Sequence, residues 1–517
     1  MKKLLLLMSL TFIMFQAASN QQLLFAQTDG TLDNTFGTGG KVFTPIGSQD
    51  AAANAVALQS DGKIVVAGWS YNSGIYDEII AARYNANGTI DNTFGTAGIV
   101  VGNPGNYADG YAVAVQSDGK ILLAGLAEIG ANNDFVLIRL NTDGSTDNTF
   151  GTSGMVTTDF AGGDDRAFAI AIQTDGKIVL AGQAYNGSDL DIALARYNTN
   201  GTLDNTFGTS GKITKAIGTG DELAYAVALQ TDGKIVVCGS CWNGTSYDLA
   251  LLRYTTNGTL DNTFGTSGVE TLDVGGNDNY GIGLALQTDG KIVTCGYTAV
   301  GTGDFAISRF NTNGTLDNTF GTTGTVITDF NTSNDAPYSV IIQLNGKIVV
   351  AGTTSVGGSS VDFALARYNT DGTLDNTFGT SGEAITPVGP GNDWTTSMVL
   401  QPDGKVVVAG YGYNASSTDV IEVVRYFISP TGINEIQDEN DNTIIYPNPA
   451  KNSITVTTSL QAKDNILSIY NIQGQLVFTQ PLLSNKADIN IENLATGVYT
   501  IKISNTENTV IKRLVKE

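Results

Sequence analysis

The sequence predicts an all-β protein, a seven-bladed β-propeller followed by a small β-sandwich. First, a motif of the form LDNTFG returns seven times at intervals of 56 to 58 residues, with its aromatic residue at Phe36, Phe94, Phe150, Phe207, Phe264, Phe320 and Phe378. Second, each unit carries an Asp-Gly or Asn-Gly turn between two apolar stretches, which is a strong β-hairpin signal. Third, these stretches combine large and small apolar side chains, so that identical sheets can stack around an axis.

The fourth unit shows the four predicted strands clearly. Residues 211–217, 224–230, 234–240 and 248–254 read GKITKAI, AYAVALQ, KIVVCGS and DLALLRY. The turn TDG between the second and third strands predicts a hairpin closed by a type I′ turn. Val227 and Leu229 point to one side of the second strand and alanines to the other, so the sheet is expected to be buried on both faces. A β-helix or open solenoid also repeats, but its rungs of about 20 to 30 residues are shorter, so the propeller is favoured.

The order of the strands along the chain predicts how the ring closes. The first LDNTFG motif and the strand GKVFT at residues 40–44 precede the first hairpin, and nothing similar follows the last strand, VIEVVRYF at residues 420–427. If the hairpin strand is innermost and GKVFT is outermost, the N-terminal strand completes the seventh blade. The ring then closes by hydrogen bonds between its two ends and leaves no long exposed edge.

The units LDNTFG, ALQTDGKIVVAG and DFALARYN resemble the delta-60 repeat, a family of bacterial surface and secreted proteins regarded as β-propellers. The resemblance supports a propeller domain over residues 27–428. It implies a fold and no particular catalytic activity or ligand.

The N-terminus has the pattern of a secretory signal peptide. Lys2 and Lys3 precede an apolar run over residues 4–15, which is too short to span a bilayer, and cleavage is expected after Ala26, with Ser19 as the other candidate. No later segment is long and apolar enough to predict a transmembrane helix. The net charge of −23, from 27 Lys plus Arg against 50 Asp plus Glu, argues against nucleic acid as a partner.

The C-terminal part changes in composition. Residues 429–443 are polar and acidic and predict a linker, and residues 444–517 alternate like the strands of a small β-sandwich. This segment is similar to the C-terminal sorting domain of the type IX secretion system of Bacteroidetes, and the matching residues are Tyr446, Pro447, Asn448, Pro449, Gly474, Gly497, Tyr499, Lys512, Arg513 and Lys516. The resemblance implies the type IX secretion machinery as a partner and a secreted or outer-membrane-anchored protein at the cell surface. The alternative is an ordinary accessory sandwich.

Two residue types limit the chemistry. The sequence has no His, which removes the commonest general base and every Ser-His-Asp arrangement. Cys238 and Cys295 stand where other units have alanine and are expected to be buried. Cys238 and Cys241 form a CxxC without the second pair of ligands that zinc requires, and a local disulfide stays open.

A binding site is predicted at one end of the propeller, here called the variable face. It consists of the loops that join the third to the fourth strand of a unit, after KIVVAG, and those that follow GKVFT, which differ between units, whereas the opposite turns are nearly constant. Acidic residues are predicted there at Asp50, Asp109, Asp164, Asp221, Asp278, Asp335 and Asp393, and aromatic residues at Trp69, Tyr71, Tyr185, Trp242, Tyr297, Trp394, Tyr411 and Tyr413. Such groups suit sugars, cationic peptides or a bound cation. The alternative is that the acids cap turns and the aromatic residues cover blade edges.

Calcium is a further candidate at the constant turns. NTDGSTD at residues 141–147 and NTNGTLD at residues 198–204 alternate oxygen side chains around a glycine, but they lack the terminal Glu of a calcium loop. An Asx-turn, in which Asn or Asp bonds its own backbone, explains them without metal, and no other cofactor is expected. The recurring charged residues Asp191 and Arg196 are five residues apart on a strand, so they point to opposite faces and are not expected to pair with each other directly. Such repeated charges are expected to tie neighbouring blades by hydrogen bonds.

Two classes of function remain. A binding or scaffold protein for glycan or protein is favoured, because no asymmetric catalytic cluster is visible. The alternative is a carbohydrate-active hydrolase or lyase that uses two carboxylates of the variable face.

Overall fold

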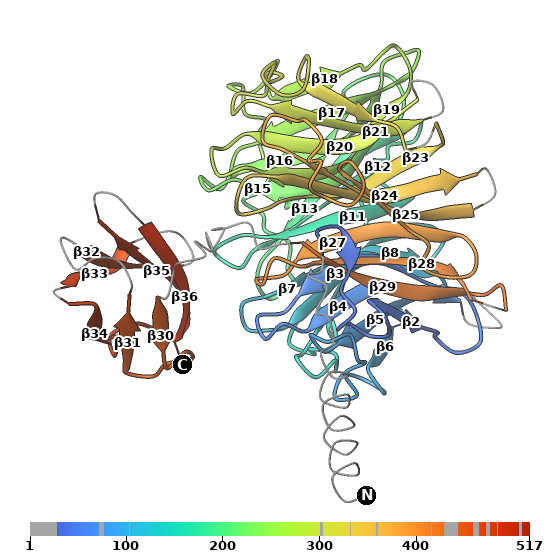
Figure 1. The fold of residues 1–517 in the computed structure, drawn as a ribbon. Coiled ribbons are helices and arrows are strands. Elements are labelled where there is room, and N and C mark those ends of the chain that lie inside the picture. Colours follow the sequence, from blue (N-terminus) through green and yellow to red (C-terminus); the bar gives the residue numbers. More distant parts are fainter. Residues whose placement is uncertain are drawn as a thin grey trace, which may run out of the picture. The chain divides into compact units, whose positions relative to one another are not determined.

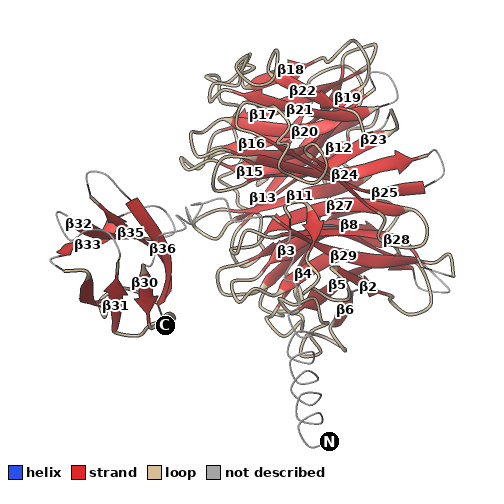
Figure 2. Ribbon diagram, viewed as in Figure 1, coloured by secondary structure: helices blue, strands red, loops and turns tan. Residues whose placement is uncertain are grey.

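The computed structural model describes residues 28–71, 77–102, 104–299, 303–330, 332–357, 360–414, 416–428, 443–458, 465–471, 476–482, 484–505 and 509–516. The chain divides into two compact units, one ending at Ser429 and the other beginning at Pro430. Every regular element of the described part is a strand (Figure 2). Among these residues no helix is long and apolar enough to cross a membrane. The predicted signal peptide, the linker up to residue 442 and Gly474 lie outside the described residues.

The first unit contains seven antiparallel sheets that follow one another along the chain (Figure 1). Six of these sheets, or blades, each consist of four strands that are consecutive in the chain. Blade 1 contains β3 (Ala51–Leu58), β4 (Ile64–Tyr71), β5 (Asp77–Tyr84) and β6 (Ile99–Gly102); blade 2 contains β7 (Ala108–Val115), β8 (Ile121–Ile129), β9 (Asn132–Leu140) and β10 (Met155–Thr158); and blade 3 contains β11 (Asp165–Ile172), β12 (Ile178–Tyr185), β13 (Leu190–Tyr197) and β14 (Lys212–Lys215). Blade 4 contains β15 (Glu222–Leu229), β16 (Ile235–Trp242), β17 (Tyr247–Tyr254) and β18 (Val269–Leu272); blade 5 contains β19 (Asn279–Leu286), β20 (Ile292–Thr298), β21 (Asp304–Phe310) and β22 (Thr325–Thr328); and blade 6 contains β23 (Asp335–Ile342), β24 (Ile348–Val356), β25 (Ser360–Tyr368) and β26 (Glu383–Thr386). The first strand of each blade contacts the first strand of the next, and β27 contacts β3, so these strands form a closed inner ring. The predicted seven-bladed propeller is confirmed.

The seventh blade combines the two ends of the unit. It contains β27 (Asp393–Leu400), β28 (Val406–Tyr413), β29 (Asp419–Phe427) and, on the outer side of β29, β2 (Lys41–Thr44). Lys41 pairs with Val424 and Thr44 with Ile421. The short strand β1 (Thr31–Leu32) extends the same edge, because Thr31 pairs with Phe427. The N-terminal strand therefore closes the ring, as the chain order predicts.

The hairpin between the first two strands of a blade forms, but its turn differs from the predicted type I′. In blade 4 only Gly233 of the turn takes a positive φ, of +83°. Gly233 donates its N–H to Gln230, and Gln230 donates to Lys234. This is a three-residue loop that ends in a left-handed glycine, the other common hairpin connection.

Each inner strand contains a β-bulge. In blade 4 the pairing of β15 with β16 shifts between Ala224 and Ala226, so Tyr225 has no cross-strand partner. The corresponding bulged residues of the seven blades are Asn54, Tyr111, Phe168, Tyr225, Ile282, Tyr338 and Thr396. All seven line a central cavity of about 250 Å³. The strict alternation expected for this strand is therefore wrong, because the inner strand faces a cavity as well as its neighbours.

A charged joint is repeated between all neighbouring blades. Arg196, at the end of β13, donates from Nε to Asp204 at 2.8 Å and from Nη1 to the carbonyl oxygen of Thr256 in the next blade. Lys177 also pairs with Asp204, at 3.1 Å, and the guanidinium of Arg196 lies 4.5 Å above the ring of Phe207. Burial opposes ionisation, but hydrogen bonds from Thr206 and Lys177 and the charge of Arg196 hold the pKa of Asp204 below its usual value. The expected tie between blades is confirmed for the arginine, which bonds Asp204 in its own blade and Thr256 in the next and, as expected, does not pair with Asp191.

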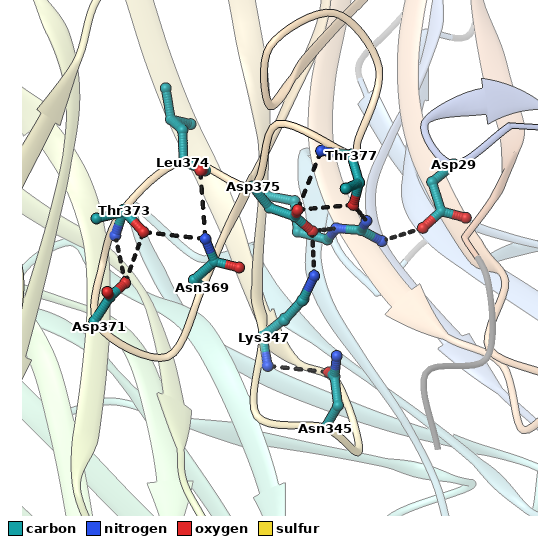
Figure 3. A network of polar contacts seen from close by, with 10 residues as sticks. Asp29, Asn345, Lys347, Asn369, Asp371, Thr373, Leu374, Asp375 and Thr377 are labelled. Atoms are coloured by element: carbon teal, nitrogen blue, oxygen red, sulfur yellow. Dashed lines mark hydrogen bonds and ion pairs between the residues drawn. The ribbon is translucent and has the colours of Figure 1, made fainter. Parts of the chain in front are cut away.

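The copy of this joint at the ring closure uses a carboxylate from the N-terminal segment (Figure 3). Asp375 accepts from Arg367 at 2.6 Å and from Lys347 at 2.5 Å. Nη1 of Arg367 donates to the carboxylate of Asp29 at 2.7 Å, whereas the equivalent atom in the other copies donates to a backbone carbonyl oxygen. Residues next to the predicted signal peptide thus take part in the interface between blades 6 and 7.

The second unit is a two-sheet β-sandwich. One sheet contains β30 (Ile444–Tyr446), β31 (Ser453–Thr457) and β34 (Lys486–Asn490), and the other β33 (Leu476–Leu482), β32 (Asn465–Tyr470), β35 (Gly497–Ser504) and β36 (Thr509–Lys516). Its core is formed by residues such as Ile454, Leu467 and Ile501, which are fully or almost fully buried. The predicted sandwich is confirmed.

The residues predicted to carry the sorting signal gather around β36. Asn448 accepts the backbone N–H of Val515 on its side-chain oxygen at 2.8 Å, which places the Tyr446 to Pro449 segment beside this strand. Gly497 pairs with Lys516 at the same end, and Lys512 and Arg513 lie on β36 itself. Tyr499 is buried and donates its hydroxyl to the carbonyl oxygen of Ala495 at 2.8 Å.

Candidate functional site

Four of the predicted acids on the variable face connect adjacent blades. Each of them is the residue immediately before the first strand of a blade, and they are Asp50, Asp164, Asp221 and Asp278. A side-chain oxygen of each accepts a backbone N–H at 2.9 to 3.0 Å from the third strand of the preceding blade, and the donors are Asp419, Asn133, Leu190 and Tyr247. These four carboxylates therefore have a structural use.

The prediction that all seven acids occupy equivalent loop positions is wrong. Asp109, Asp335 and Asp393 lie within the first strands β7, β23 and β27. Asp335 and Asp393 are buried, and each accepts the backbone N–H of the residue five positions earlier at 2.6 Å. The loops before the first strands differ between blades, so acids at similar places in the sequence of the repeat do not occupy equivalent places in the structure.

The closing blade buries a second acid beside Asp393. Glu422, on β29, is fully buried, and its carboxylate and that of Asp393 both lie over Gly412 of β28, where a Cβ would meet them at 2.8 and 2.6 Å. Burial, together with the charge of Asp393 and a hydrogen bond with it, raises the pKa of Glu422 to about 9, and Lys41 opposes this shift. Glu422 is therefore protonated in the folded protein at neutral pH.

We expect Glu422→Gln to weaken the pH dependence of stability. An acid whose pKa is raised by folding keeps its proton in the folded state, so its contribution to stability falls as the pH rises from about 4.5 to about 9. The loss is at most about 1.4 kcal/mol per pH unit. Urea unfolding at pH 5, 6.5 and 8 should show the advantage of the variant over the natural protein growing with pH. Parallel curves for the two proteins would contradict the assignment.

A row of four aromatic side chains crosses from blade 4 to blade 5 on the variable face. Trp242 and Tyr247 are paired across β16 and β17 with ring centroids 5.2 Å apart. Tyr247 lies 5.1 Å from Tyr280, and Tyr280 lies 6.3 Å from Tyr297, its partner across β19 and β20. All four rings are half-buried. Of these the sequence predicts Trp242 and Tyr297 as site residues and misses the two tyrosines between them.

Carboxylates flank this row. Asp278 fixes the backbone N–H of Tyr247. Burial and the charges of Asp221 and Asp278 raise the pKa of Tyr247, and burial and Asp278 raise that of Tyr280 to about 12. Both phenols are therefore neutral at physiological pH, and the row presents apolar ring faces next to negative charge.

The remaining predicted aromatic residues lie on other blades. Trp394 stacks on Tyr411 at 5.1 Å and meets the edge of Tyr413 at 5.5 Å, all within blade 7. Trp69 is half-buried on β4, whereas Tyr71 and Tyr185 end their strands and are exposed by 44% and 38%. The structure thus brings two groups of predicted residues together and leaves Tyr71 and Tyr185 at separate blades.

Asp109 belongs to an asymmetric polar cluster near the central cavity. Its Oδ2 accepts the hydroxyls of Tyr107 at 2.6 Å and Tyr111 at 3.0 Å, and its buried Oδ1 has no hydrogen-bond partner. Burial and the charge of Asp109 raise the pKa of Asp77, and the charge of Arg166 acts on both tyrosines. The sequence gives no signal for this cluster, because its members come from three different blades.

The turns considered for calcium show the hydrogen bonds of Asx-turns. Asp143 accepts the backbone N–H of Ser145 at 2.9 Å, and Asn200 accepts that of Thr202 at 3.1 Å. Asp147 and Asp204, the last oxygen residues of these turns, are held by the arginine and lysine of the joint. Calcium in these turns stays an untested prediction.

The three cysteines are buried and unpaired. Cys238 and Cys295 have no exposed surface, as expected from the alanine positions that they occupy. The open alternative of a local Cys238–Cys241 disulfide is therefore not realised. Burial raises the pKa of the Cys241 thiol to about 12, which makes it a poor nucleophile.

The fold and the variable face define the class of protein: an exported β-propeller with a regular scaffold and an irregular end. Seven segments of the chain match the family described as a domain of unknown function (DUF5122) β-propeller, at residues 59–94, 116–150, 173–207, 230–264, 287–320, 343–378 and 401–427. Residues 444–517 match the secretion system C-terminal sorting domain. The chain therefore contains seven DUF5122 β-propeller repeats and a type IX secretion sorting domain, and it is secreted or attached to the outer-membrane surface.

Solved structures with a similar fold are distant. A protein of unknown function from Dyadobacter fermentans is 11% identical with a TM-score of 0.42, over 75% of this chain and 98% of that one. PorZ, a surface component of the type IX secretion system of Porphyromonas gingivalis, is 11% identical with a TM-score of 0.26, over 97% and 88%. The polysaccharide lyase Uly1 is 12% identical with a TM-score of 0.43, over 78% and 94%. No curated protein matches the chain. At these scores none of the three structures bears on the function of this protein.

Proposed function

We propose that this protein is a glycan-binding propeller, exported by the type IX secretion system, that holds its ligand on the aromatic row of blades 4 and 5. The row from Trp242 to Tyr297 is the observation that carries the proposal. A pyranose has an apolar C–H face and a rim of hydroxyls, so it matches half-buried aromatic faces beside carboxylates. The row lies on the face whose loops vary between blades, which is where recognition on a rigid scaffold is usually found.

The test is glycan-array binding by the mature full-length chain. We expect Tyr247→Ala combined with Tyr280→Ala to reduce binding at least tenfold, because these two residues form the middle of the row. The matched control is Tyr71→Ala together with Tyr185→Ala, which removes two tyrosines from the same face and should leave binding unchanged. Tyr247→Phe, which keeps the ring, should also bind. Absence of glycan binding, or equal binding by all variants, would refute the proposal, and capture of proteins alone would favour a protein ligand.

The Asp109 cluster supports a second candidate, cleavage of a polysaccharide. Two interacting carboxylates, Asp77 and Asp109, lie with two tyrosines and Arg166 in one asymmetric group, and two acids suffice for glycoside hydrolysis. The glycans of the same array separate the two candidates. New reducing ends or unsaturated products that disappear with Asp109→Asn would favour the enzyme, whereas unchanged glycans would favour binding alone.

A further inference from the structure

Two blade junctions carry the same set of three carboxylates. Between blades 2 and 3 these are Asp134 on β9, Asp159 directly after β10, and Asp165 at the start of β11. One side-chain oxygen of each lies within 4.8 Å of those of the other two. The junction of blades 5 and 6 repeats this arrangement with Asp304, Asp329 and Asp335. Each cluster therefore joins two neighbouring blades through three negative groups.

The inner carboxylate of each cluster is buried and only half satisfied. Asp165 is 0% exposed and Asp335 1% exposed. Their Oδ2 atoms accept the backbone N–H of Phe160 at 2.7 Å and of Phe330 at 2.6 Å. The Oδ1 atoms of Asp165, Asp335 and also Asp304 are buried without a hydrogen-bond partner. A buried anionic oxygen without a partner is strongly unfavourable, so these oxygens require either a proton or a cation.

Within the described parts of the chain, no basic side chain neutralises either cluster. None of the six acids forms an ion pair with Lys or Arg among the described residues. Lys212 approaches Asp159, but it donates to the backbone carbonyl oxygen at 2.8 Å. Burial and the charges of the neighbouring acids raise the pKa of Asp165 to about 7 and that of Asp335 to about 6. The acids therefore repel one another in the absence of a positive ligand.

The other junctions provide an internal comparison. Between blades 4 and 5 the third position is Asn279, whose amide donates to Asp273 at 3.5 Å. Between blades 3 and 4 the second position is Ala216, and between blades 6 and 7 it is Pro387. Among the junctions with all three positions described, the full set thus occurs only twice. Both times the second acid precedes a phenylalanine, Phe160 or Phe330, that packs 4.9 Å from a phenylalanine of the third strand.

We propose that each of these two clusters binds one divalent cation, calcium in preference to magnesium, which links the adjoining blades. Calcium is coordinated by six to eight oxygen atoms at about 2.3 to 2.6 Å, so one ion can contact three oxygens that lie within 4.8 Å of one another. Only oxygen ligands are present, which excludes a site of the zinc thiolate or imidazole type. The outer acids Asp159 and Asp329 are exposed and give the ion access from solvent. At the second site the hydroxyl of Thr354, the cross-strand partner of Asp335, is buried beside this carboxylate and offers a further oxygen ligand.

Calorimetric titration of the mature full-length chain, stripped with EGTA, tests this proposal with calcium and magnesium chloride. We expect the natural protein to bind two calcium ions per chain. Each single variant, Asp165→Asn or Asp335→Asn, should bind one ion. The double variant should bind calcium at least tenfold more weakly at both sites. Calcium should raise the melting temperature of the natural protein and leave that of the double variant unchanged. Asn keeps an oxygen for the backbone N–H and removes a repelling charge, so the variants should fold.

The matched control is Asp143→Asn, which alters an Asx-turn at the constant end of the propeller and should still bind two ions. Loss of calcium in this control, or calcium binding that persists in the double variant, would overturn the proposal. A melting temperature that is unchanged by millimolar calcium would also overturn the proposal, since the acids would then be stabilised by protons alone. Equal affinity for magnesium would overturn the preference for calcium.

Discussion

Deleting residues 28–46 is expected to open the propeller ring. The deletion removes β1 and β2, the two strands that pair with the outer side of β29. It also removes Asp33, which accepts from the buried Arg425 at 2.9 Å and pairs with Lys405 at 2.9 Å. Loss of one partner of a buried ion pair costs about 3–5 kcal/mol, in addition to the lost strand pairing. The truncated chain should melt at a much lower temperature and associate through the exposed edge of β29.

Thermal unfolding followed by circular dichroism, together with light scattering on a sizing column, measures both effects. The matched control is a chain that ends at residue 429, which lacks the second compact unit and keeps β1 and β2. Its propeller should melt as in the full chain. A monomeric N-terminal truncation with an unchanged melting temperature would show that the ring does not depend on this closure.

Phe207→Ala is expected to destabilise the propeller by about 3–5 kcal/mol. The ring of Phe207 has no exposed surface and belongs to a buried cluster that contains Val179 of blade 3 and Val237 of blade 4. Arg196 covers one side of it. Gly258 of the next blade approaches so closely that a Cβ there would lie 2.9 Å from the ring. Since this glycine has no side chain that could move into the vacated space, the substitution leaves a cavity between two blades.

Chemical denaturation of the natural and substituted chains gives the change in the free energy of unfolding. Phe43→Ala is the matched control, because Phe43 lies on the outer strand β2 and is 46% exposed. That substitution should change stability by less than about 0.5 kcal/mol. Equal effects of the two substitutions would contradict the placement of Phe207 as a wedge between blades.

The repeated features of the propeller could be predicted because each has a local cause. The glycine-containing turn and the LDNTFG segment act within a few residues of the chain, and seven copies make their spacing unmistakable. The closure by β2 followed from chain order alone, since a strand left over at the start must pair with the edge left over at the end. The partner of Arg196 was less accessible, because the spacing excludes a direct pair with Asp191 but does not identify Asp204, which follows the strand in the next turn.

The candidate sites depend on contacts between blades and were harder to predict. Tyr247 and Tyr280 belong to different repeats and meet only because blades 4 and 5 are adjacent. The three acids of each proposed calcium site come from the third strand, the following loop and the next blade, about 31 residues apart in all. The bulge at Tyr225 was hidden because an apolar residue fits either a regular strand or a bulge. The repeat period therefore predicts the scaffold. Sites that depend on differences between repeats can be recognised only in the assembled ring.

The bulged residues of the inner strands line the central cavity but take no part in the cross-strand pairing that the scaffold requires. A bulged residue has no cross-strand partner, so its side chain can change without altering the ladder on either side. Each blade contributes one such residue, and these already range from Asn54 and Thr396 to Phe168 and Tyr225. The propeller axis is therefore a seven-position array with one independently replaceable side chain per repeat, and its polarity and size can diverge between related proteins while the blades stay the same.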